Sequence, residues 1–142
     1  MKILSVNTGS SSIKCALYEM PKERLLMKGE IERIGQSPSL ITTAIGQNKR
    51  RENRDIAGYH QGIEMLLKTL TEGETRVLES IDQIEAVGHR VVHGGQSFEK
   101  ALLVNDETMS LIKKYGEFAA KIRNPWSGHV RRSARHQGRP CA

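Results

Sequence analysis

Three short runs of hydrophobic residues in the first part of the chain predict three β-strands, and the second of them follows the two-residue period of a strand. The runs cover residues 2–7, 13–18 and 25–34, and segments rich in Gly, Ser and Pro separate them as tight turns would. Successive side chains of a strand point to opposite faces of the sheet. In the second run, one face would carry Ile13, Cys15 and Leu17, and the other Lys14, Ala16 and Tyr18. Three strands joined by short turns predict an antiparallel meander.

A fourth strand is predicted over residues 39–45, and the charged segment after it, residues 46–54, is predicted as a loop or a hairpin tip. The basic side chains of this segment suggest a nucleic-acid patch, but the segment contains no aromatic residue on which a base could stack. A solvated turn is the simpler interpretation. The basic residues are Lys49, Arg50, Arg51 and Arg54.

From Tyr59 onward the hydrophobic period lengthens to that of a helix, which we expect to end near Gly73. β-Branched residues return over residues 84–92 and predict another strand. A second helix is expected after Asn105, an effective N-cap that two acidic residues follow. The apolar stripes of the two helices would be Tyr59, Ile63, Leu66, Leu67 and Leu70, and Leu111, Ile112, Tyr115, Phe118, Ala119 and Ile122.

The resulting order is β-β-β, a further hairpin, then α-β-α, so the predicted fold class is α/β, a mixed sheet with helices packed on it. The length of 142 residues suits one domain, and with only 4% aromatic residues the core must be aliphatic. Cys15, in mid-strand, is expected to be a small core residue rather than a nucleophile, and the two cysteines indicate no disulfide framework.

The chain shows no membrane or export signal. No run approaches the ~18 apolar residues of a membrane span, and the first residues turn polar too soon for a secretory leader. We therefore expect a cytoplasmic protein without a membrane partner.

The net charge of +6 is concentrated at the end of the chain. Residues 123–142 contain five arginines and no acidic residue, whereas residues 1–122 are almost neutral, with 17 basic and 16 acidic side chains. After Trp126 the tail has too few aliphatic residues to fold by itself. We expect a domain over 1–122 and a basic, disordered tail over 123–142. Binding of nucleic acid through the tail is the alternative, and the neutral body gives it no support.

The first candidate for chemistry runs from Asn7 to Lys14, Asn-Thr-Gly-Ser-Ser-Ser-Ile-Lys, and joins the first two predicted strands. Gly9 permits a tight turn whose hydroxyl and backbone N–H groups can surround phosphate oxygens. Lys14 adds a compact positive charge, and the Asn7 amide oxygen suits hydrated Mg²⁺. The segment is not a Walker A loop. Its composition also fits an ordinary serine-rich hairpin turn.

The second candidate is Gly88-His-Arg-Val-Val-His-Gly-Gly95, in which a predicted strand runs into two glycines. Arg90 and Val92 would share one face of this strand, with His89 and His93 on the other. A guanidinium there can bind a carboxylate or phosphate through two hydrogen bonds, or it can pair with a structural acid. The two histidines are two pleats apart with no third ligand nearby, so a zinc site is not expected.

Together, the two motifs resemble the two N-terminal signatures of the acetate kinases in sequence, order and spacing, and the acidic start of the second predicted helix is similar as well. The resemblance implies a ribonuclease-H-like half-domain of the sugar kinase, heat-shock ATPase and actin superfamily. It runs from residue 1 to about Pro125, the first third of a complete family member, and the chain then departs from the family. The departure, with a tail rich in Arg, Gly, Ala and Pro, suggests a truncated or frameshifted member.

The resemblance implies an enzyme that transfers phosphoryl between ATP and acetate, giving ADP and acetyl phosphate. Arg90 would be catalytic and would bind the acetate carboxylate, with Val92 near the acetate methyl group. The residues implied to face ATP and Mg²⁺ are Asn7 at the metal, and Ser10, Ser12 and Lys14 along the phosphate path. Other groups of a complete member have no counterpart here, so we expect the chain to be inactive alone.

The resemblance leaves alternatives for the substrate and the role. Propionate and butyrate kinases are the nearest relatives of the acetate kinases, and the second motif favours acetate or propionate. A non-catalytic phosphate-binding fragment is another alternative, because much of the catalytic core has no counterpart in the chain. A homodimer is expected only for a full-length protein, since family dimers form chiefly through the C-terminal part.

Overall fold

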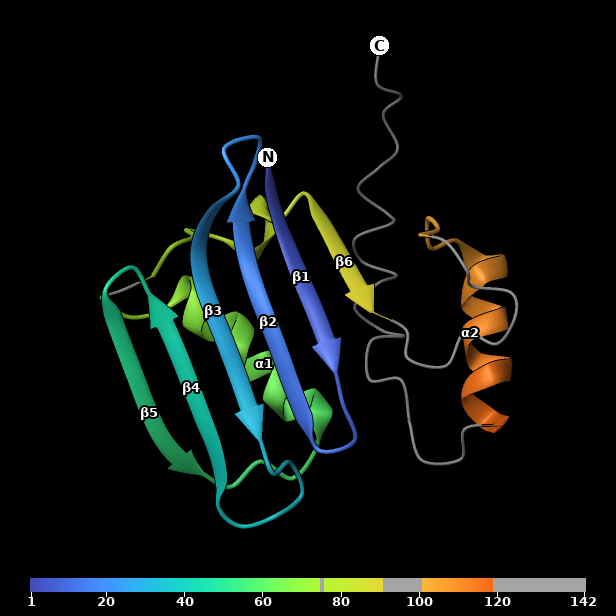
Figure 1. The fold of residues 1–142 in the computed structure, drawn as a ribbon, viewed down its shortest axis with the longest axis horizontal. Helices are drawn as coiled ribbons and strands as arrows, with labels where there is room; N and C mark the ends of the chain where they lie inside the picture. Colours follow the sequence, from blue (N-terminus) through green and yellow to red (C-terminus); the bar gives the residue numbers. More distant parts are fainter. Residues whose placement is uncertain (75, 91–100, 119–142) are drawn as a thin grey trace. The chain divides into compact units, whose positions relative to one another are not determined.

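A β-sheet with one helix against it makes up the first of the two units into which the chain divides (Figure 1). The computed structural model describes residues 1–74, 76–90 and 101–118. The sheet belongs to the first unit, Met1–Arg90, and the second unit, Val91–Ala142, contains one described helix.

The strands of the sheet are β1 (Lys2–Thr8), β2 (Ser12–Glu19), β3 (Arg24–Glu32), β4 (Ser39–Ile45), β5 (Asn48–Arg54) and β6 (Ala86–Arg90). Their order across the sheet is β5-β4-β3-β2-β1-β6. The first five strands run antiparallel to their neighbours, and β6 lies parallel to β1. A parallel neighbour requires a crossover, which helix α1 (Tyr59–Thr71) supplies between β5 and β6. The predicted meander, the strand over residues 39–45 and the α-β order after it are confirmed.

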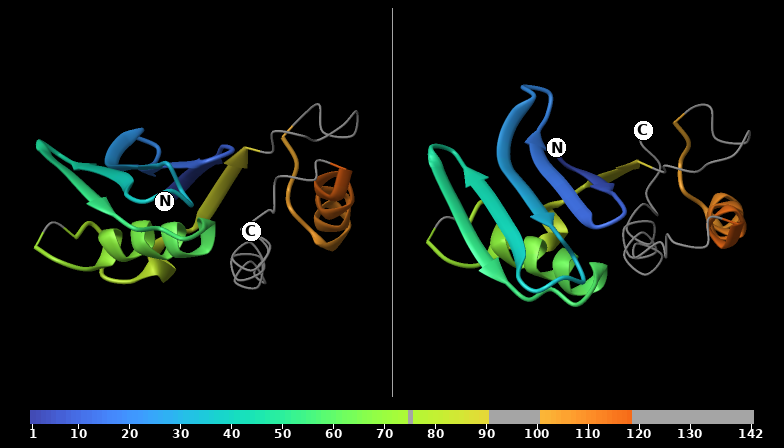
Figure 2. Two further views of the ribbon diagram at one scale, coloured as in Figure 1. Left: turned by 90° about the horizontal axis from the view of Figure 1, so that it is seen from below. Right: turned by 60° about the horizontal axis from the view of Figure 1, so that its bottom comes forward.

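Helix α1 covers one face of the sheet, as two further views show (Figure 2). The strand side chains on this face are mostly aliphatic and buried, and Ile13 and Leu17 expose no surface. Each Å² of apolar area that this packing removes from water contributes roughly 25 cal/mol to stability. Because Lys14 is exposed on the opposite face, the predicted alternation of the second strand is confirmed. The core comprises Leu4, Val6, Ile13, Cys15, Leu17, Met27, Ile31, Ile34, Ile41, Ile56, Ile63, Leu66, Leu70 and Leu78.

A glycine lets helix α1 lie close to the sheet. Gly62 is buried, and a Cβ atom added to it would lie 2.9 Å from Ile13 Cδ1 and 3.2 Å from Ile31 Cδ1. These separations are shorter than the optimal contact of about 3.5–4.0 Å between carbon atoms. The helix therefore approaches β2 and β3 as closely as it does only because residue 62 has no side chain. The predicted stripe is confirmed at its buried members, Ile63, Leu66 and Leu70.

The charged segment over residues 46–54 forms the turn and one arm of a hairpin, which confirms the predicted further hairpin. The arm is a strand, so the alternative of a loop over this segment was wrong. β5 pairs with β4 over all of its 7 residues, and only Gly46 and Gln47 form the turn, with a φ of +57° at Gly46. All residues of β5 except Glu52 are exposed. β5 is an edge strand of the described sheet, where charged side chains keep both faces solvated and discourage pairing with another chain.

In the second unit, helix α2 (Asp106–Phe118) begins where the sequence predicts. The Asn105 side chain accepts a hydrogen bond from the Thr108 backbone N–H (2.9 Å), and the Thr108 hydroxyl accepts one from the Asn105 N–H (2.7 Å). This reciprocal capping satisfies N–H groups of the first turn. Of the predicted stripe, Ile112 is buried, and the positions after it lie outside the described side chains. Neither described α-helix is long and apolar enough to cross a membrane.

The strand predicted over residues 84–92 begins later than expected. β6 starts at Ala86, after a short 3₁₀ turn over Ile81–Gln83, and its described part ends at Arg90. The continuation to residue 92 and the tail over 123–142 lie outside the described residues. The predicted domain boundary after residue 122 therefore stays a prediction.

Candidate functional site

Three of the predicted site residues lie side by side across the sheet. Asn7, near the end of β1, is the register partner of Lys14 on β2 and of Arg90 on β6. Directly opposed residues on neighbouring strands have their side chains on the same face. This face is the one that α1 leaves open, because Val6 and Thr8, which flank Asn7, are buried on the other face. An amide, an ammonium and a guanidinium thus form a row, the Lys14–Asn7–Arg90 row.

The turn between β1 and β2 brings the predicted hydroxyl groups next to this row. The Gly9 backbone N–H donates to the Ser12 carbonyl oxygen (2.8 Å), which closes the turn. A Cβ atom at Gly9 would lie 2.8 Å from Ser12 Oγ, so a side chain at residue 9 would make the Ser12 hydroxyl turn away from its present position. Ser10 is exposed near the tip, and Ser12 is half-buried at the start of β2. Both predicted phosphate-binding serines therefore lie in the segment that links Asn7 to Lys14.

A tyrosine of α1 fixes the same turn from the helix side. The Tyr59 hydroxyl donates to the Gly9 carbonyl oxygen (2.7 Å), and the Ile34 N–H donates to the Ser11 carbonyl oxygen (2.9 Å). Burial raises the pKa of Tyr59, which keeps the hydroxyl protonated and able to donate. In the sequence, Tyr59 counts only as one residue of an apolar stripe. The sequence could have indicated a hydrogen bond from Tyr59 through its phenol group, because a buried tyrosine hydroxyl usually has a hydrogen-bond partner.

Lys14 is held by an acidic residue of the next strand. Its Nζ atom lies 2.7 Å from Glu30 Oε1, and the two residues are register partners on β2 and β3. The hydrogen bond and charge of Glu30, with a smaller contribution from Glu32, raise the pKa of Lys14, so its ammonium stays charged at neutral pH. The Lys14 side chain is 54% exposed, and solvent therefore screens the attraction. Glu30 was not among the predicted site residues, because only the strand register brings it to Lys14.

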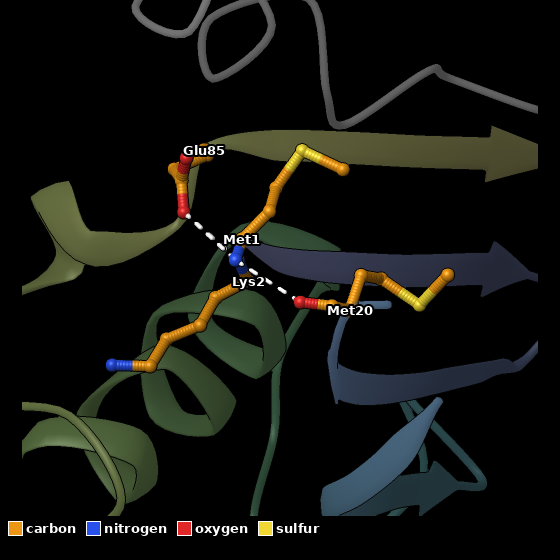
Figure 3. Close-up of polar contacts among 4 residues, drawn as sticks. All are labelled: Met1, Lys2, Met20 and Glu85. Carbon is orange, nitrogen blue, oxygen red and sulfur yellow. Dashed lines mark hydrogen bonds and ion pairs between the residues drawn. The ribbon is translucent and has the colours of Figure 1, made fainter. Parts of the chain in front are cut away.

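Glu85 joins the start of β6 to the start of β1 (Figure 3). Its backbone N–H donates to the Lys2 carbonyl oxygen (2.9 Å), and its carboxylate accepts from the Lys2 backbone N–H (3.0 Å). The Met1 amino group lies 3.6 Å from the same carboxylate oxygen and donates to the Met20 carbonyl oxygen (3.3 Å). The two bonds between Glu85 and Lys2 are named the Glu85–Lys2 clamp.

This clamp is in the register in which β6 pairs with β1, and it stabilises that pairing at one end. Directly after it, Ile3 faces Ala86, and the ladder continues residue by residue until Asn7 faces Arg90. The hydrogen bonds of a parallel pair are evenly spaced, so the register fixed at one end is kept at the other. The clamp therefore supports, from the opposite end of β6, the register that places Arg90 in the row.

His89 lies on the helix side of β6, opposite to Arg90, as predicted. Its Nε2 atom is 3.5 Å from the hydroxyl oxygen of Thr8, a residue that is only 4% exposed. Burial lowers the pKa of His89, which favours the neutral imidazole at neutral pH. Val92 and His93 lie outside the described residues, so their predicted places on the two faces stay predictions.

Cys15 belongs to the core. It is 8% exposed, and burial raises the pKa of its thiol to about 12. The reactive thiolate therefore does not form at neutral pH. Among the residues that the structure describes, no three His, Cys, Asp or Glu side chains are grouped so that they could hold a metal ion.

A groove of about 880 Å³ lies elsewhere, between the β4–β5 hairpin and the second half of α1. It contains none of the predicted site residues. Its lining carries charges of both signs, and two of them, Arg50 and Glu52, form an ion pair (2.9 Å). The charged residues are Lys49, Arg50, Arg54 and Lys68, and Glu52, Glu72 and Glu74. This balance indicates no particular class of ligand, and the groove is separate from the row.

Comparisons with known proteins agree with the two motifs. Residues 2–134 match the sequence model of the Acetokinase family. The acetate kinases of Bacillus anthracis and Bacillus subtilis (strain 168) are each 41% identical to the chain over 124 residues. These residues are 87% of the chain but only 30% and 31% of the two relatives. The chain thus spans about a third of the length of the curated relatives that it matches.

Two solved structures resemble the fold. The acetate kinase of Porphyromonas gingivalis has a TM-score of 0.78 and 28% sequence identity, over 96% of this chain and 34% of that one. A propionate kinase from Francisella tularensis subsp. tularensis SCHU S4 has a TM-score of 0.73 and 31% identity, over 92% of this chain and 32% of that one. These likenesses confirm the predicted fold class, a mixed α/β sheet of the ribonuclease-H-like type found in the sugar kinase, heat-shock ATPase and actin superfamily.

Proposed function

Because the chain belongs to the acetokinase family, we propose that it forms the N-terminal part of the site of a carboxylate phosphotransferase, in which phosphoryl passes between ATP and acetate. The observation that carries this proposal is the position of the Lys14–Asn7–Arg90 row beside the turn of residues 9–12, which we name the serine turn. Phosphoryl transfer needs two anionic substrates to be aligned and the charge that develops between them to be neutralised. Two cations and an amide in fixed register, next to hydroxyl groups, suit both tasks.

In this proposal, the serine turn and Lys14 receive the phosphate groups of ATP. Ser10 and Ser12 offer hydroxyl donors to phosphate oxygens. Lys14 supplies a compact charge on a flexible stem, which can follow the phosphoryl group as it moves. The bonds of Gly9 to Ser12 and to Tyr59 hold the turn before an anion arrives. Such preorganisation lowers the cost of aligning the substrate.

Arg90 acts on the other substrate. Its guanidinium can donate two parallel hydrogen bonds to the acetate carboxylate or to the equatorial oxygens of the transferring phosphoryl group. Asn7 separates Arg90 from Lys14 in the row, so a phosphoryl group above Asn7 meets a positive charge on either side. Val92, proposed near the acetate methyl group, lies outside the described residues.

One residue of the row, Asn7, offers an oxygen atom that a hydrated Mg²⁺ could contact. Mg²⁺ prefers oxygen ligands and keeps several of its waters, and the half-buried Asn7 offers an amide oxygen on the open face. The neighbouring carboxylate of Glu30, on β3, is held by Lys14 instead. We propose that Asn7 contacts the ion through its amide oxygen or through a bound water. Bound with ATP, the ion would supply further neutralisation of the phosphate charge.

Two alternatives each have an observation in their favour. The solved propionate kinase is about as similar to the chain as the solved acetate kinase, at 31% and 28% identity, so propionate is an alternative substrate. Because the chain spans about a third of its relatives, phosphate binding without catalysis is the alternative role for the chain alone. A cytoplasmic location and a homodimer of a full-length protein stay predictions.

The proposal is tested with a chimera in which residues 1–122 replace the matching N-terminal part of the Bacillus subtilis acetate kinase. We expect the chimera to form acetyl phosphate from ATP, Mg²⁺ and acetate, measured as the hydroxamate. Lys14→Gln in the chimera should lower turnover by about 10²-fold or more, the usual cost of removing one group that stabilises the transition state. Parallel assays with propionate decide between the two carboxylates.

The control variant is Lys28→Gln, which removes an exposed lysine from the same face of the sheet outside the row. It should leave turnover unchanged. A chimera that unfolds cooperatively on heating, and is therefore folded, but transfers phosphoryl to neither carboxylate would contradict the proposal. The 142-residue chain assayed by itself should show binding at most and no turnover.

A further inference from the structure

Glu30 lies next to the Lys14–Asn7–Arg90 row, on the side of Lys14 that faces away from Asn7. Its register partners are Lys14 on β2 and Thr42 on β4. The Glu30 side chain is 24% exposed, compared with 54% for Lys14. The carboxylate is therefore the more firmly packed partner, and the long, flexible lysine stem follows it. The resting position of the Lys14 ammonium is set by Glu30.

The Lys14 ammonium can turn in two directions along the row. Toward β3 it meets the Glu30 carboxylate at 2.7 Å. Toward β1 and β6, the described residues of the row are Asn7 and Arg90, which carry no negative charge. An anion that binds on the β1 side must therefore draw the ammonium away from Glu30 or share it.

We propose that Glu30 is a positioning residue for Lys14, and that its carboxylate competes with an incoming phosphate group for the lysine ammonium. This inference rests on the proposed function, because it assumes that Lys14 lines the phosphate path. Before an anion binds, Glu30 holds the ammonium on the open face, toward β3 and away from Asn7. Glu32, the register partner of Ser12, adds a second negative charge near the path. The two acids together lower the affinity of the turn for anions.

The competition predicts a change that an ion pair of purely structural importance would not produce. Loss of a structural ion pair lowers stability and leaves anion binding unchanged or weaker. Loss of a competing carboxylate strengthens anion binding. Exposed ion pairs contribute little free energy, and the usual range of that contribution corresponds to a change in affinity of about two- to fivefold.

The experiment measures the binding of inorganic pyrophosphate to the complete 142-residue chain by NMR titration at low ionic strength. Pyrophosphate is the probe because it carries two linked phosphoryl groups without adenosine. We expect Glu30→Gln to bind it about two- to fivefold more tightly than the wild type, and Lys14→Gln to bind it more weakly. Glu30→Asp keeps the charge on a shorter stem and should lie between the wild type and Glu30→Gln.

A second readout follows the ionisation of Lys14 through its ε-methylene signals, without any anion. Glu30 is the main cause of the raised pKa of Lys14, so Glu30→Gln should lower that pKa. The matched control is Glu19→Gln, which removes another ion pair between β2 and β3, Glu19 Oε2 to Arg24 Nη2 at 2.8 Å. It should change neither the pKa of Lys14 nor the affinity for pyrophosphate.

The outcomes separate this inference from the proposed function. If Lys14→Gln binds pyrophosphate as tightly as the wild type, the proposed phosphate path is wrong, and the role of Glu30 is wrong with it. If Lys14→Gln weakens binding but Glu30→Gln fails to strengthen it, only the role of Glu30 is wrong. If neither the wild type nor Glu30→Gln binds pyrophosphate, competition is again refuted, and the proposed function is judged by the chimera.

Discussion

Asn7 and Arg90 face each other on the parallel strands β1 and β6, at the end of the pair that adjoins the serine turn. The register that brings them together is stabilised at the other end by the Glu85–Lys2 clamp. A slip of one residue would turn Arg90 to the helix side and bring His89 to the open face, because strand side chains alternate. The composition of the row therefore depends on a contact that lies outside it.

Glu85→Ala should weaken the pairing of β6 with β1 and leave the meander intact. The change removes the acceptor of the Lys2 N–H, and the loss of one such hydrogen bond costs about 1 kcal/mol. We expect faster amide hydrogen exchange over residues 86–90 and unchanged exchange in β2 and β3. Glu79→Ala alters an exposed glutamate in the same connection and should have no effect. Equal exchange rates over residues 86–90 in both variants would show that the clamp does not hold β6.

Tyr59→Phe should loosen the serine turn without removing the packing of the ring. It deletes the hydroxyl that donates to the Gly9 carbonyl oxygen, at a cost of about 1 kcal/mol in the free energy of unfolding. Hydrogen exchange of the Gly9 amide, which closes the turn on Ser12, should become faster. Tyr18→Phe, on the open face of β2, serves as the control. Unchanged exchange at Gly9 in Tyr59→Phe would mean that the turn holds itself.

Gly62→Ala should destabilise the first unit, although alanine is the better helix former. The added Cβ atom would lie 2.9 Å from Ile13 Cδ1, and overpacking of this kind costs about 1–3 kcal/mol. Gly58→Ala is the control for an added Cβ without a clash, because no atom lies within 4 Å of it. It should cost less than Gly62→Ala, although Gly58 is the N-cap of α1, where glycine is preferred to alanine. Ile13→Val removes the Cδ1 atom and should restore part of the lost stability to Gly62→Ala. The check is urea unfolding of the wild type, Gly62→Ala, Gly58→Ala and the double variant Gly62→Ala with Ile13→Val. Equal stability of the two single alanine variants would contradict the prediction.

Acidification should destabilise the first unit through His89. Burial lowers the pKa of His89 below its ordinary value of 6.5, so the unfolded chain takes up the proton at a higher pH than the folded chain does. The resulting stability is present above pH 6.5 and is lost as the pH falls through the folded-state pKa of His89. The urea midpoint should decrease between about pH 7 and pH 5, and less so in His89→Gln. Glutamine takes up no proton in this range, so an identical dependence in His89→Gln would exclude His89 as the cause.

Strands and helices that are indicated by neighbouring residues in the sequence were predictable. The alternation of residues 13–18 follows from one buried face, and the start of α2 follows from the side chain of Asn105. The strand β5 was not predictable in this way, since its composition suits an edge position that only the assembled sheet defines. Local pattern identifies elements that bury a face, and it fails where both faces are solvated.

In the candidate site, too, some features were predictable from the local sequence and others only from the assembled sheet. The two motifs indicated Asn7, Lys14 and Arg90 separately, but only the pairing of β1 with both neighbours shows that they share one row. Glu30 and Glu85 were missed because each acts on a residue of another strand. No spacing in the sequence encodes such a partner. Strand register, which the sequence leaves open, decides these contacts.

The most direct test of the account is the kinetics of Arg90→Lys in the chimera, with the melting temperature measured on the same preparation. A lysine keeps the charge but cannot donate two parallel hydrogen bonds. If Arg90 stabilises the transition state of phosphoryl transfer, kcat and kcat/KM for acetate should fall together by about tenfold or more, with little change in melting temperature. A rise in KM alone would restrict Arg90 to binding the carboxylate. Unchanged kinetics with a lower melting temperature would contradict the account, because Arg90 would then be structural and the row would not be part of the site.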